Sequence, residues 1–335
     1  MRGVEGGRVV ARALVVTDSQ GKQRRLGRRL ERGGEGEIFA LRDRPDVIVK
    51  WYYPEVLDKR GEELHRKVEA MRGLRDAHMT RDVCWPLIRV FDERHRWIGF
   101  AMYRARGVKM SFLAHALLCE RYFPGLDRRR IVAYLIRFIE IVQQLHEAGV
   151  CIGDYNLNNV FCVPSSGQVT LIDCDSYQLR VDGTFYPCPV GSPDMTPKEH
   201  QGVSFRHTVR TPRSEAFSLA IVLFKCLMLG RHPYDIVGGD DPVRNLRRGN
   251  FAYGRGQRDV PQGVWYELWR ELPDTLRDMF VTTFTVGADA PAQRATLAQW
   301  HAALSDYREA MAAGRCAVHL AKPGRPRRSQ VQHAR

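Results

Sequence analysis

Two short segments carry the side chains of this chain that could perform chemistry together. Residues 153–160 contain an acid, Asp154, and an amide, Asn159, five positions later, and a second acid, Asp173, follows a short apolar run. An acid can accept a proton from a reacting group, and carboxylate and amide oxygens are the hard ligands that Mg²⁺ prefers. Because Mg²⁺ usually shares such ligands with phosphate oxygens, this order favours phosphate chemistry.

Two features nearer the N-terminus could also contact phosphate. Gly33, Gly34 and Gly36 lie in a turn between predicted strands, where glycine lets backbone N–H groups approach phosphate oxygens, although an ordinary hairpin turn explains the same residues. Lys50 ends an apolar strand in a chain with only eight lysines among its 52 basic residues. A flexible ammonium group suits a phosphate reached through a narrow gap, and the alternative is a strand-end lysine whose charge reaches water.

The elements that must position these residues fall into two stretches. The first third predicts strands at residues 9–16, 26–41, 47–52, 84–90 and 97–103, with one helix at 61–74. From residue 127 onward the pattern predicts helices at 128–148, 214–229, 276–284 and 296–305. The first of these has one apolar stripe and a glycine, Gly149, at its C-cap. We therefore expect an α+β fold with a β-rich N-terminal lobe and a helical C-terminal lobe.

Composition limits the class of protein. The chain has 335 residues, of which 44% are hydrophobic, enough for one large or two modest cores. It has no apolar run near the roughly 18 residues of a membrane span and no apolar segment at its start, so we expect a cytoplasmic protein. Its eight cysteines lack C-x-x-C spacing, which favours reduced thiols over disulfides or a metal site.

The formal charge of +14 raises the question of nucleic-acid binding. Arginine is used almost everywhere in the chain, so a general compositional bias explains most of this charge. The local concentration is at residues 322–328, which are basic, broken by proline and glycine, and free of acids. We predict a disordered basic tail, for which weak contact with nucleic acid is the functional alternative to a merely solvated segment.

In their order along the chain, these motifs resemble those of the protein kinase family. Residues 30–38 resemble the glycine-rich loop, with Glu31 where its first glycine usually stands, and residues 47–50 resemble the strand that bears the phosphate-binding lysine. Residues 145–149 resemble the stretch that precedes the catalytic loop. The resemblance implies that Asp154 is the catalytic base, that Asn159 and Asp173 hold metal, and that Lys50 contacts the α- and β-phosphates. It also implies the residues that cover the nucleotide, which are Gly33, Gly34, Gly36 and Ile38.

The resemblance extends over about residues 26–305. Residues 191–199 resemble the end of an activation segment, 215–220 the start of the buried F helix, and 230–234 the loop after it. In the same family an arginine, here Arg294, pairs with the activation-segment glutamate, here Glu199. The implied organisation is an N-terminal extension with a strand (1–25), an N-lobe (26–103), a hinge (104–107), a C-lobe (108–305) and a basic tail (306–335).

Further motifs are similar to those of one bacterial subgroup, the YegI-like kinases found with a von Willebrand A-type protein and a PP2C-type phosphatase. These motifs are Cys-Trp-Pro at 84–86, Gly-Phe-Ala-Met at 99–102, Asp-Cys-Asp-Ser-Tyr at 173–177, and residues 190–202. The resemblance implies those two proteins as partners, in addition to a protein substrate.

Three departures from the family pattern bear on activity. Gly153 stands where many kinases have an arginine that meets a phosphorylated activation loop, so we expect no dependence on that switch. Asn156 replaces the catalytic-loop lysine, whose loss should slow transfer. Cys174 and Asp175 replace the phenylalanine and glycine of D-F-G. Asp175 is either a third metal-facing carboxylate or, as we favour, a cap for the following turn.

The partner of Lys50 is ambiguous among Glu62, Glu63 and Glu69, and we choose Glu63. The resemblance also implies a nucleotide pocket gated by Met102, although packing alone would explain that residue. The adenine would contact the backbone at Tyr103 and Ala105.

The sequence as a whole predicts an ATP-dependent protein kinase that acts on serine or threonine in a bacterial signalling module, with Asn156 in its atypical catalytic loop. Its metal is Mg²⁺, with Mn²⁺ as an alternative. The main rival is an ATP-binding pseudokinase or scaffold with little or no transfer. A second rival is a phosphotransferase acting on small molecules, because residues 153–154 resemble aminoglycoside-kinase loops.

Overall fold

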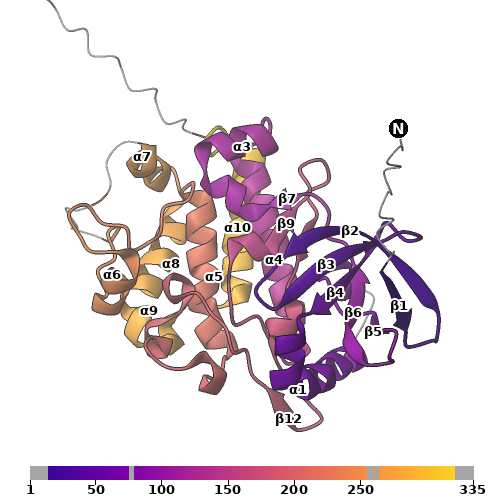
Figure 1. Cartoon of the computed structure of the whole chain (residues 1–335). Helices are drawn as coiled ribbons and strands as arrows, with labels where there is room; N and C mark the ends of the chain where they lie inside the picture. The colour runs from indigo at the N-terminus through magenta and orange to yellow at the C-terminus, as the bar shows by residue number, and fades with distance from the viewer. Residues whose placement is uncertain (1–13, 75–78, 255–259, 261–263, 321–335) are drawn as a thin grey trace, which may run out of the picture. The chain divides into compact units, whose positions relative to one another are not determined.

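The chain divides into two compact units, Met1–Ala105 and Arg106–Arg335. A computed structural model describes residues 14–74, 79–254, 260 and 264–320 (Figure 1). Strands dominate the first unit and helices the second, which confirms the predicted α+β class, and the boundary falls within residues 104–107. Within these described ranges, no helix is both long and apolar enough to cross a membrane. The eight cysteines all lie within the described residues, and none of them is in a disulfide.

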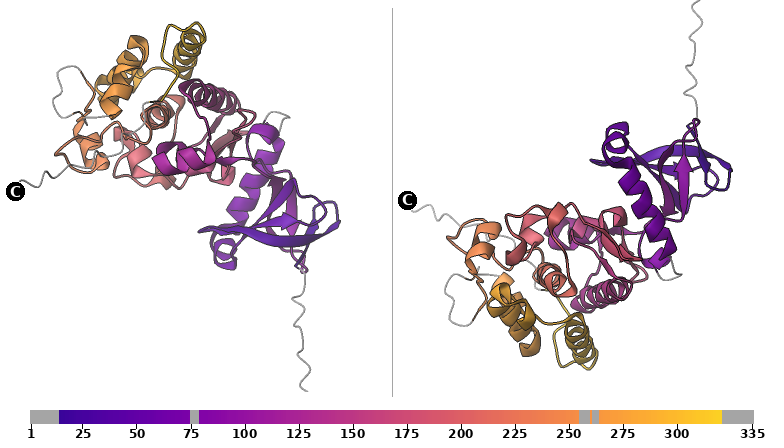
Figure 2. Two further views of the ribbon diagram at one scale, coloured as in Figure 1. Left: turned by 90° about the horizontal axis from the view of Figure 1, so that it is seen from above. Right: turned by 90° about the horizontal axis from the view of Figure 1, so that it is seen from below.

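The strands described in the N-terminal unit close into a barrel with the order β1-β2-β3-β4-β6-β5. They are β1 (Val15–Asp18), β2 (Gln23–Arg32), β3 (Gly36–Leu41), β4 (Val47–Tyr52), β5 (Ile88–Phe91) and β6 (Trp97–Tyr103). Helices α1 (Pro54–Gly73) and α2 (Met79–Asp82) lie between β4 and β5 in the chain, and α1 packs beside β6 (Figure 2).

Alternating apolar side chains fill this barrel. Val16, Leu26, Phe39, Val49 and Val90 belong to one buried cluster to which all six strands contribute, β6 through Ile98 and Ala101. All neighbouring strands are antiparallel, and β4 lies between β3 and β6. Lys50 is thereby held in the middle of the sheet, opposite Ile38 on one side and Phe100 on the other.

Several predicted boundaries in this unit were wrong. The extension predicted for residues 1–25 includes β1 and the start of β2, which belong to the barrel because Val16 and Leu26 share its core. Most of the strand predicted at 9–16 lies outside the described residues. The helix predicted at 61–74 begins earlier, at Pro54, whose fixed φ and missing N–H suit the first helical turn. The strand predicted at 84–90 is confined to β5.

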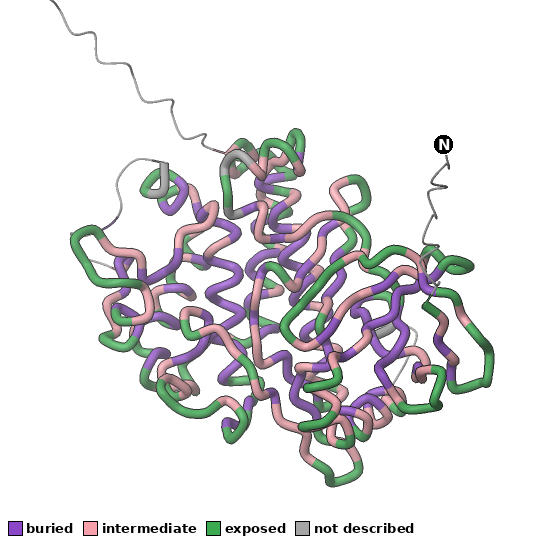
Figure 3. Tube along the Cα trace, in the orientation of Figure 1, coloured by how far each residue is buried: buried purple, intermediate pink, exposed green. Residues whose placement is uncertain are grey.

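The C-terminal unit is built around helix α5, which runs between its other helices (Figures 1 and 2). The described helices are α3 (Ala116–Tyr122), α4 (Arg128–Glu147), α5 (Pro212–Leu227), α6 (Pro242–Arg248), α7 (Val264–Arg270), α8 (Asp274–Phe284), α9 (Val286–Asp289) and α10 (Leu297–Ala312). Helix α5 is buried along nearly its whole length (Figure 3). It begins in a capping box between Thr211 and Ser214, with Pro212 in its first turn, so its N-terminus has a defined position.

Short strands of two small sheets flank the loops that lie beside α4 and α5. One sheet has the order β10-β9-β7 and the other β12-β11-β8. Their strands are β7 (Val108–Lys109), β8 (Val150–Cys151), β9 (Val160–Cys162), β10 (Val169–Leu171), β11 (Gln178–Val181) and β12 (Thr184–Tyr186). Short 3₁₀ helices lie in the connections of this unit: η1 (Met110–Ala114), η2 (Leu157–Asn159), η3 (Cys174–Ser176), η4 (Pro193–Met195), η5 (Lys198–His200), η6 (Phe205–His207) and η7 (Pro291–Gln293).

The tail predicted for residues 306–335 was wrong at its start. Helix α10 continues to Ala312, because Tyr307 and Met311 extend its buried face against α4. Arg128 donates a hydrogen bond to the Tyr307 hydroxyl at 3.1 Å, and its backbone N–H donates to the Val318 carbonyl at 2.9 Å. The basic run at 322–328 lies outside the described residues.

Candidate active site

The loop that contains Asp154 begins where α4 ends. Gly149 follows the helix with φ of 74°, and β8 then pairs with β11 in the register Cys151 opposite Gln178. After β8 the chain reverses at Gly153, where the Asp154 N–H donates to the Ile152 carbonyl at 2.9 Å. The half-buried Asp154 is therefore presented at the end of a strand whose position is set by α4 and β11.

Gly153 has no room for a side chain. Its φ is 75°, and an added Cβ would lie 2.5 Å from Cys188 Sγ and 2.7 Å from Cys188 Cβ. Both the backbone conformation and the packing thus exclude the arginine that many kinases have here. The sequence identified the departure, and the tertiary structure supplies its cause.

Replacement of Gly153 by alanine is expected to destabilise the protein by more than the roughly 1–2 kcal/mol of left-handed strain alone. The matched control is Gly183→Ala, since Gly183 has φ of 77° but nothing within 4 Å of an added Cβ. Urea unfolding of both variants measures the difference. Equal free energies of unfolding would contradict the clash with Cys188.

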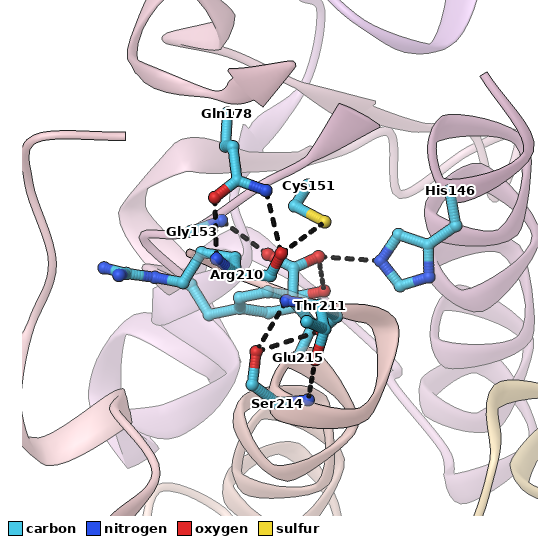
Figure 4. Close-up of polar contacts among 9 residues, drawn as sticks. His146, Cys151, Gly153, Gln178, Arg210, Thr211, Ser214 and Glu215 are labelled. Atoms are coloured by element: carbon cyan, nitrogen blue, oxygen red, sulfur yellow. Dashed lines mark hydrogen bonds and ion pairs between the residues drawn. The ribbon is translucent and has the colours of Figure 1, made fainter. Parts of the chain in front are cut away.

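Glu215, in the first turn of α5, holds this loop from below (Figure 4). One carboxylate oxygen accepts the Gly153 N–H at 2.6 Å, and the other lies 3.1 Å from the Tyr155 hydroxyl and 2.7 Å from His146 Nε2. The Glu215 side chain is 2% exposed. Burial raises the pKa of Tyr155, so its hydroxyl keeps the proton that it donates. Sequence patterns located the start of this helix but gave no sign of these three partners.

Asp154 accepts a hydrogen bond from the Ser192 hydroxyl at 2.8 Å. Burial raises the pKa of the Asp154 carboxyl above its ordinary value, and the nearby negative charges of Asp173 and Asp194 act in the same direction. The hydrogen bonds from Ser192 oppose that shift. The sequence placed Ser192 in an activation-segment motif but did not indicate this contact with the predicted base.

Ser192→Ala is expected to raise the pKa of Asp154 further, because it removes a donor to the ionised carboxylate. If Asp154 acts in its ionised form, the acid limb of the pH profile of phosphotransfer should move to higher pH. The profile of kcat/KM for the variant and for the control Ser166→Ala measures this. An unshifted acid limb would show that the Ser192 hydroxyl does not control the protonation of Asp154.

The predicted metal ligands Asn159 and Asp173 lie at one end of a hairpin. Strands β9 and β10 pair with Val160 opposite Leu171, and the Ile172 N–H donates to the Asn159 carbonyl at 2.9 Å. Asp173 is exposed and has φ of 61°, in the left-handed region. Two hard oxygen donors in this place, one of them an exposed carboxylate, are a donor set that fits Mg²⁺.

Asn156 and Asp175, the two unusual residues of these loops, both lie in short 3₁₀ turns or at their caps. The Asn156 side chain accepts the Asn158 N–H at 2.9 Å and caps η2, a structural role that was not expected for a predicted catalytic residue. Asp175 is 4% exposed and lies inside η3, whose N-cap position is Asp173. Asp175 thus stands two residues after the N-cap position of η3, and its interpretation as a cap for the following turn stays a prediction.

The predicted pairing of Arg294 with Glu199 is confirmed. The guanidinium group donates to both carboxylate oxygens at 2.7 Å and to the Gly287 carbonyl at the same distance. The Arg294 side chain is 1% exposed and stacks over Phe217 of α5 at 4.9 Å. This pair fixes the end of the segment that carries Ser192.

In the N-terminal unit, Lys50 is 8% exposed, with Nζ 5.4 Å from the centre of the Tyr52 ring. It is therefore not a strand-end lysine that extends into water. Gly33 and Gly36 close the hairpin between β2 and β3, the Gly33 N–H donating to the Gly36 carbonyl at 2.9 Å. A Cβ at Gly36 would lie 2.3 Å from the Trp51 carbonyl oxygen, so close approach of β4 requires glycine there. Gly34 has open space around it.

Two of the three candidate glutamates for Lys50 are engaged elsewhere. Glu62 has a side chain 87% exposed and lies 3.7 Å from Arg66, while Glu69 pairs with Arg72 and Arg89. Glu63 is half-buried on α1 and stays the predicted partner.

The residues predicted to meet the nucleotide base lie at the end of β6 and just beyond it. Met102 is buried and Tyr103 is 40% exposed, while the backbone at Ala105 forms a hydrogen bond with Cys84.

One further cluster resembles a metal site by distance alone. His146, Cys151 and Glu215 place one ligand atom each within 4.8 Å of one another. The Glu215 oxygens already accept from Gly153, Tyr155 and His146, and the Cys151 thiol donates to the Arg210 carbonyl at 3.8 Å. Burial also raises the pKa of the Cys151 thiol, whereas metal binding requires the thiolate. This cluster is a hydrogen-bonded structural core.

The two units and their loops have the protein kinase fold, with a strand-rich N-terminal part and a helical C-terminal part. A rhoptry kinase from Toxoplasma gondii is similar with a TM-score of 0.61 and 14% identity, over 91% of this chain and 85% of that one. The ROP18 kinase domain in complex with AMP-PNP and sucrose is similar with a TM-score of 0.60 and 14% identity, over 90% of this chain and 86% of that one.

In sequence, the chain is similar to protein kinase YegI of Escherichia coli strain K12, with 30% identity over 311 residues. The match covers 88% of this chain and 46% of YegI. YegI of Escherichia coli O157:H7 is also 30% identical, over 298 residues, 84% of this chain and 44% of that protein. The chain thus spans about half the length of the curated relatives it matches. No protein-family model matches it.

Proposed function

We propose that this chain is a protein kinase that transfers the γ-phosphate of ATP to serine or threonine hydroxyls. The observation that carries the proposal is the contact of Ser192 with Asp154, in which an aliphatic hydroxyl donates to a carboxylate at 2.8 Å. A carboxylate that accepts such a hydrogen bond from its own chain can accept one from a substrate hydroxyl. Similarity to proteins named protein kinase YegI supports the same activity.

The C-terminal unit would supply the acid–base and metal-binding groups. Asp154 would orient the substrate hydroxyl and accept its proton, with the loop backbone held by Glu215. Asn159 and Asp173 would hold Mg²⁺, or Mn²⁺ in its place, and the bound ion would neutralise charge on the phosphates. Asn156, with its carbonyl oxygen used as a cap, would offer an amide group in place of the usual lysine cation.

The N-terminal unit would bind the rest of the nucleotide. Lys50 would contact the α- and β-phosphates and be oriented by Glu63. The residues proposed to cover the nucleotide or to contact its base are Gly33, Gly34, Gly36, Ile38, Met102, Tyr103 and Ala105.

The deciding experiment is transfer of labelled phosphate from ATP to a generic protein substrate with Mg²⁺ or Mn²⁺. Wild type is compared with Asp173→Asn and with Asp306→Asn, an exposed aspartate on α10 that serves as the control. We expect transfer by wild type and the control and none by Asp173→Asn. Equal labelling by Asp173→Asn would disprove the proposed role of Asp173.

A pseudokinase is the second candidate, favoured by the structural use of Asn156 and the burial of Asp175 in η3. It predicts that ATP raises the melting temperature of wild type while no phosphate reaches the protein itself or any substrate. Transfer only to a small hydroxylated acceptor would instead indicate a small-molecule phosphotransferase. Against the latter, the Arg294–Glu199 pair fixes a segment typical of kinases with protein substrates.

The cellular setting of this activity is proposed from resemblance alone. A bacterial cytoplasmic signalling module with a von Willebrand A-type protein and a PP2C-type phosphatase would agree with the YegI-like motifs. Contact of the basic tail with nucleic acid would appear as salt-sensitive binding that is lost on deletion of residues 316–335.

A further inference from the structure

Arg210 is a buried cation immediately before the N-cap of α5. It is 4% exposed, and burial lowers the pKa of its guanidinium group. Such a residue is costly to bury unless its donors are used. Nothing in the kinase-like motifs of the sequence singles it out.

The backbone of Arg210 is fixed by a reciprocal pair of hydrogen bonds (Figure 4). Its N–H donates to Gln178 Oε1 at 2.6 Å, and Gln178 Nε2 donates to its carbonyl oxygen at 2.8 Å. Gln178 is itself buried in β11, where it pairs with Cys151 of β8. The residue before the N-cap of α5 is therefore hydrogen-bonded to β11, which pairs with β8, the strand that leads into the Asp154 loop.

The side chain of Arg210 extends toward the segment that ends at Ser192. Its guanidinium group lies over the Phe205 ring, 4.9 Å from the ring centre, and donates long hydrogen bonds to the carbonyls of Val190 at 3.3 Å and Thr208 at 3.5 Å. Phe205 in turn covers Gly191, where an added Cβ would lie 3.0 Å from the ring. The hydrogen bond from Arg210 thus holds Val190, and the Phe205 ring on which Arg210 stacks packs on Gly191. These are the two residues before Ser192.

These contacts connect Arg210 to Asp154, the predicted base, through only a few residues. Val190 and Gly191 lead directly to Ser192, whose hydroxyl donates to Asp154 at 2.8 Å. Arg210 also adjoins the space that Gly153 leaves open, since a Cβ at residue 153 would lie 3.8 Å from Arg210 Cγ. In kinases with arginine at the position of Gly153, that cation holds the activation segment through an added phosphate. Here a cation from another element enters the same region and is satisfied by main-chain carbonyls.

We propose that Arg210 is a positioning residue that holds residues 190–192 in their substrate-receiving conformation without phosphorylation of the activation segment. This inference rests on the proposed function and specifies its regulation. Lysine could not replace arginine fully, because the planar guanidinium both stacks on Phe205 and donates to two carbonyls. The segment would therefore be assembled as soon as the chain folds.

The test uses the whole chain treated with a phosphatase and confirmed by mass spectrometry to carry no phosphate. Wild type should transfer phosphate at its full initial rate without a lag. Arg210→Gln should lower kcat by on the order of 100-fold, the effect expected when a reacting geometry shifts by about 1 Å. Arg210→Lys should recover part of the rate, and ATP should raise the melting temperature of every variant equally. Arg213→Gln, which changes the neighbouring exposed arginine, is the matched control.

Hydrogen exchange gives a readout that does not need activity. The amides of Cys188 and of residues 190–192 should exchange faster in Arg210→Gln than in wild type or Arg213→Gln, while those of α4 stay protected; Pro189 has no N–H. A lag that preincubation with ATP removes, or rates and exchange identical to those of Arg213→Gln, would overturn the proposal. If wild type transfers no phosphate, the proposed function fails and exchange still decides whether Arg210 holds the segment. If Arg210→Gln does not fold, Phe205→Leu removes the stacking surface and is judged by the same outcomes.

Discussion

Asp154→Asn is expected to slow phosphotransfer by orders of magnitude while leaving the fold at least as stable as wild type. Loss of a positioned general base should reduce kcat by about 10²- to 10⁴-fold. The amide retains an oxygen that can accept from the Ser192 hydroxyl, so the loop should keep its conformation. Transfer assays and thermal unfolding at neutral pH measure the two effects.

The sign of the stability effect follows from the pKa of Asp154, which burial raises above its ordinary value. A raised pKa means that the folded protein binds this proton more tightly than the unfolded chain does. The ionised carboxylate therefore costs stability at neutral pH, and this cost disappears as pH falls through the folded pKa. An uncharged amide removes it at every pH.

The same shift predicts how activity responds to acid. If only ionised Asp154 accepts the proton, transfer should fall at a higher pH than for an ordinary aspartate. The control for both effects is Asp306→Asn, which should match wild type in rate and melting temperature. A large loss of stability in Asp154→Asn with the control unaffected would show that the charge of Asp154 stabilises the fold instead.

Glu215→Ala is expected to cause the largest loss of stability of any single change considered, about 3–5 kcal/mol, because it removes one partner of a buried charged network. His146, the Gly153 N–H and the Tyr155 hydroxyl would lose their acceptor together. Phosphotransfer should also fall, since Gly153 directly precedes Asp154. Urea unfolding and transfer assays measure the two losses.

Glu215→Gln separates the charge of this residue from its hydrogen bonds. The amide fills the same space but replaces one acceptor oxygen with a donor, so we expect a smaller loss than for alanine. Glu267→Ala, on helix α7, is the control for removal of a helical glutamate. If Glu215→Ala unfolds at the same urea concentration as that control, the network does not hold the loop.

Elements with strong local patterns were predicted well from the sequence. Helix α4 differs from its prediction at residues 128–148 by one residue, because its apolar stripe is long and its end is marked by Gly149. Strand β6 was predicted with both of its ends. The order of Lys50, Asp154, Asn159 and Asp173 indicated the kinase-like fold because it resembles the order of the motifs in that family.

Elements whose extent depends on distant partners were predicted less well. Strand β1 is short, and what makes it part of the barrel is pairing with β2 and β5. Helix α10 runs past residue 305 because Tyr307 packs on Arg128, which lies far away in the sequence. No local pattern contains information about such contacts.

The sequence by itself determined the types and order of the groups that could do chemistry, and the pairing of Arg294 with Glu199 that follows from their motifs. Only the tertiary structure decided how those groups are held. Four contacts hold them: Glu215 beneath the Asp154 loop, Ser192 on Asp154, Cys188 against Gly153, and Arg210 over Phe205. The first three join residues that are 20 or more positions apart in the chain. Packing around α5 brings these partners together. A side chain forms hydrogen bonds with the groups that the tertiary fold places beside it, and its neighbours in the sequence do not determine which groups those are.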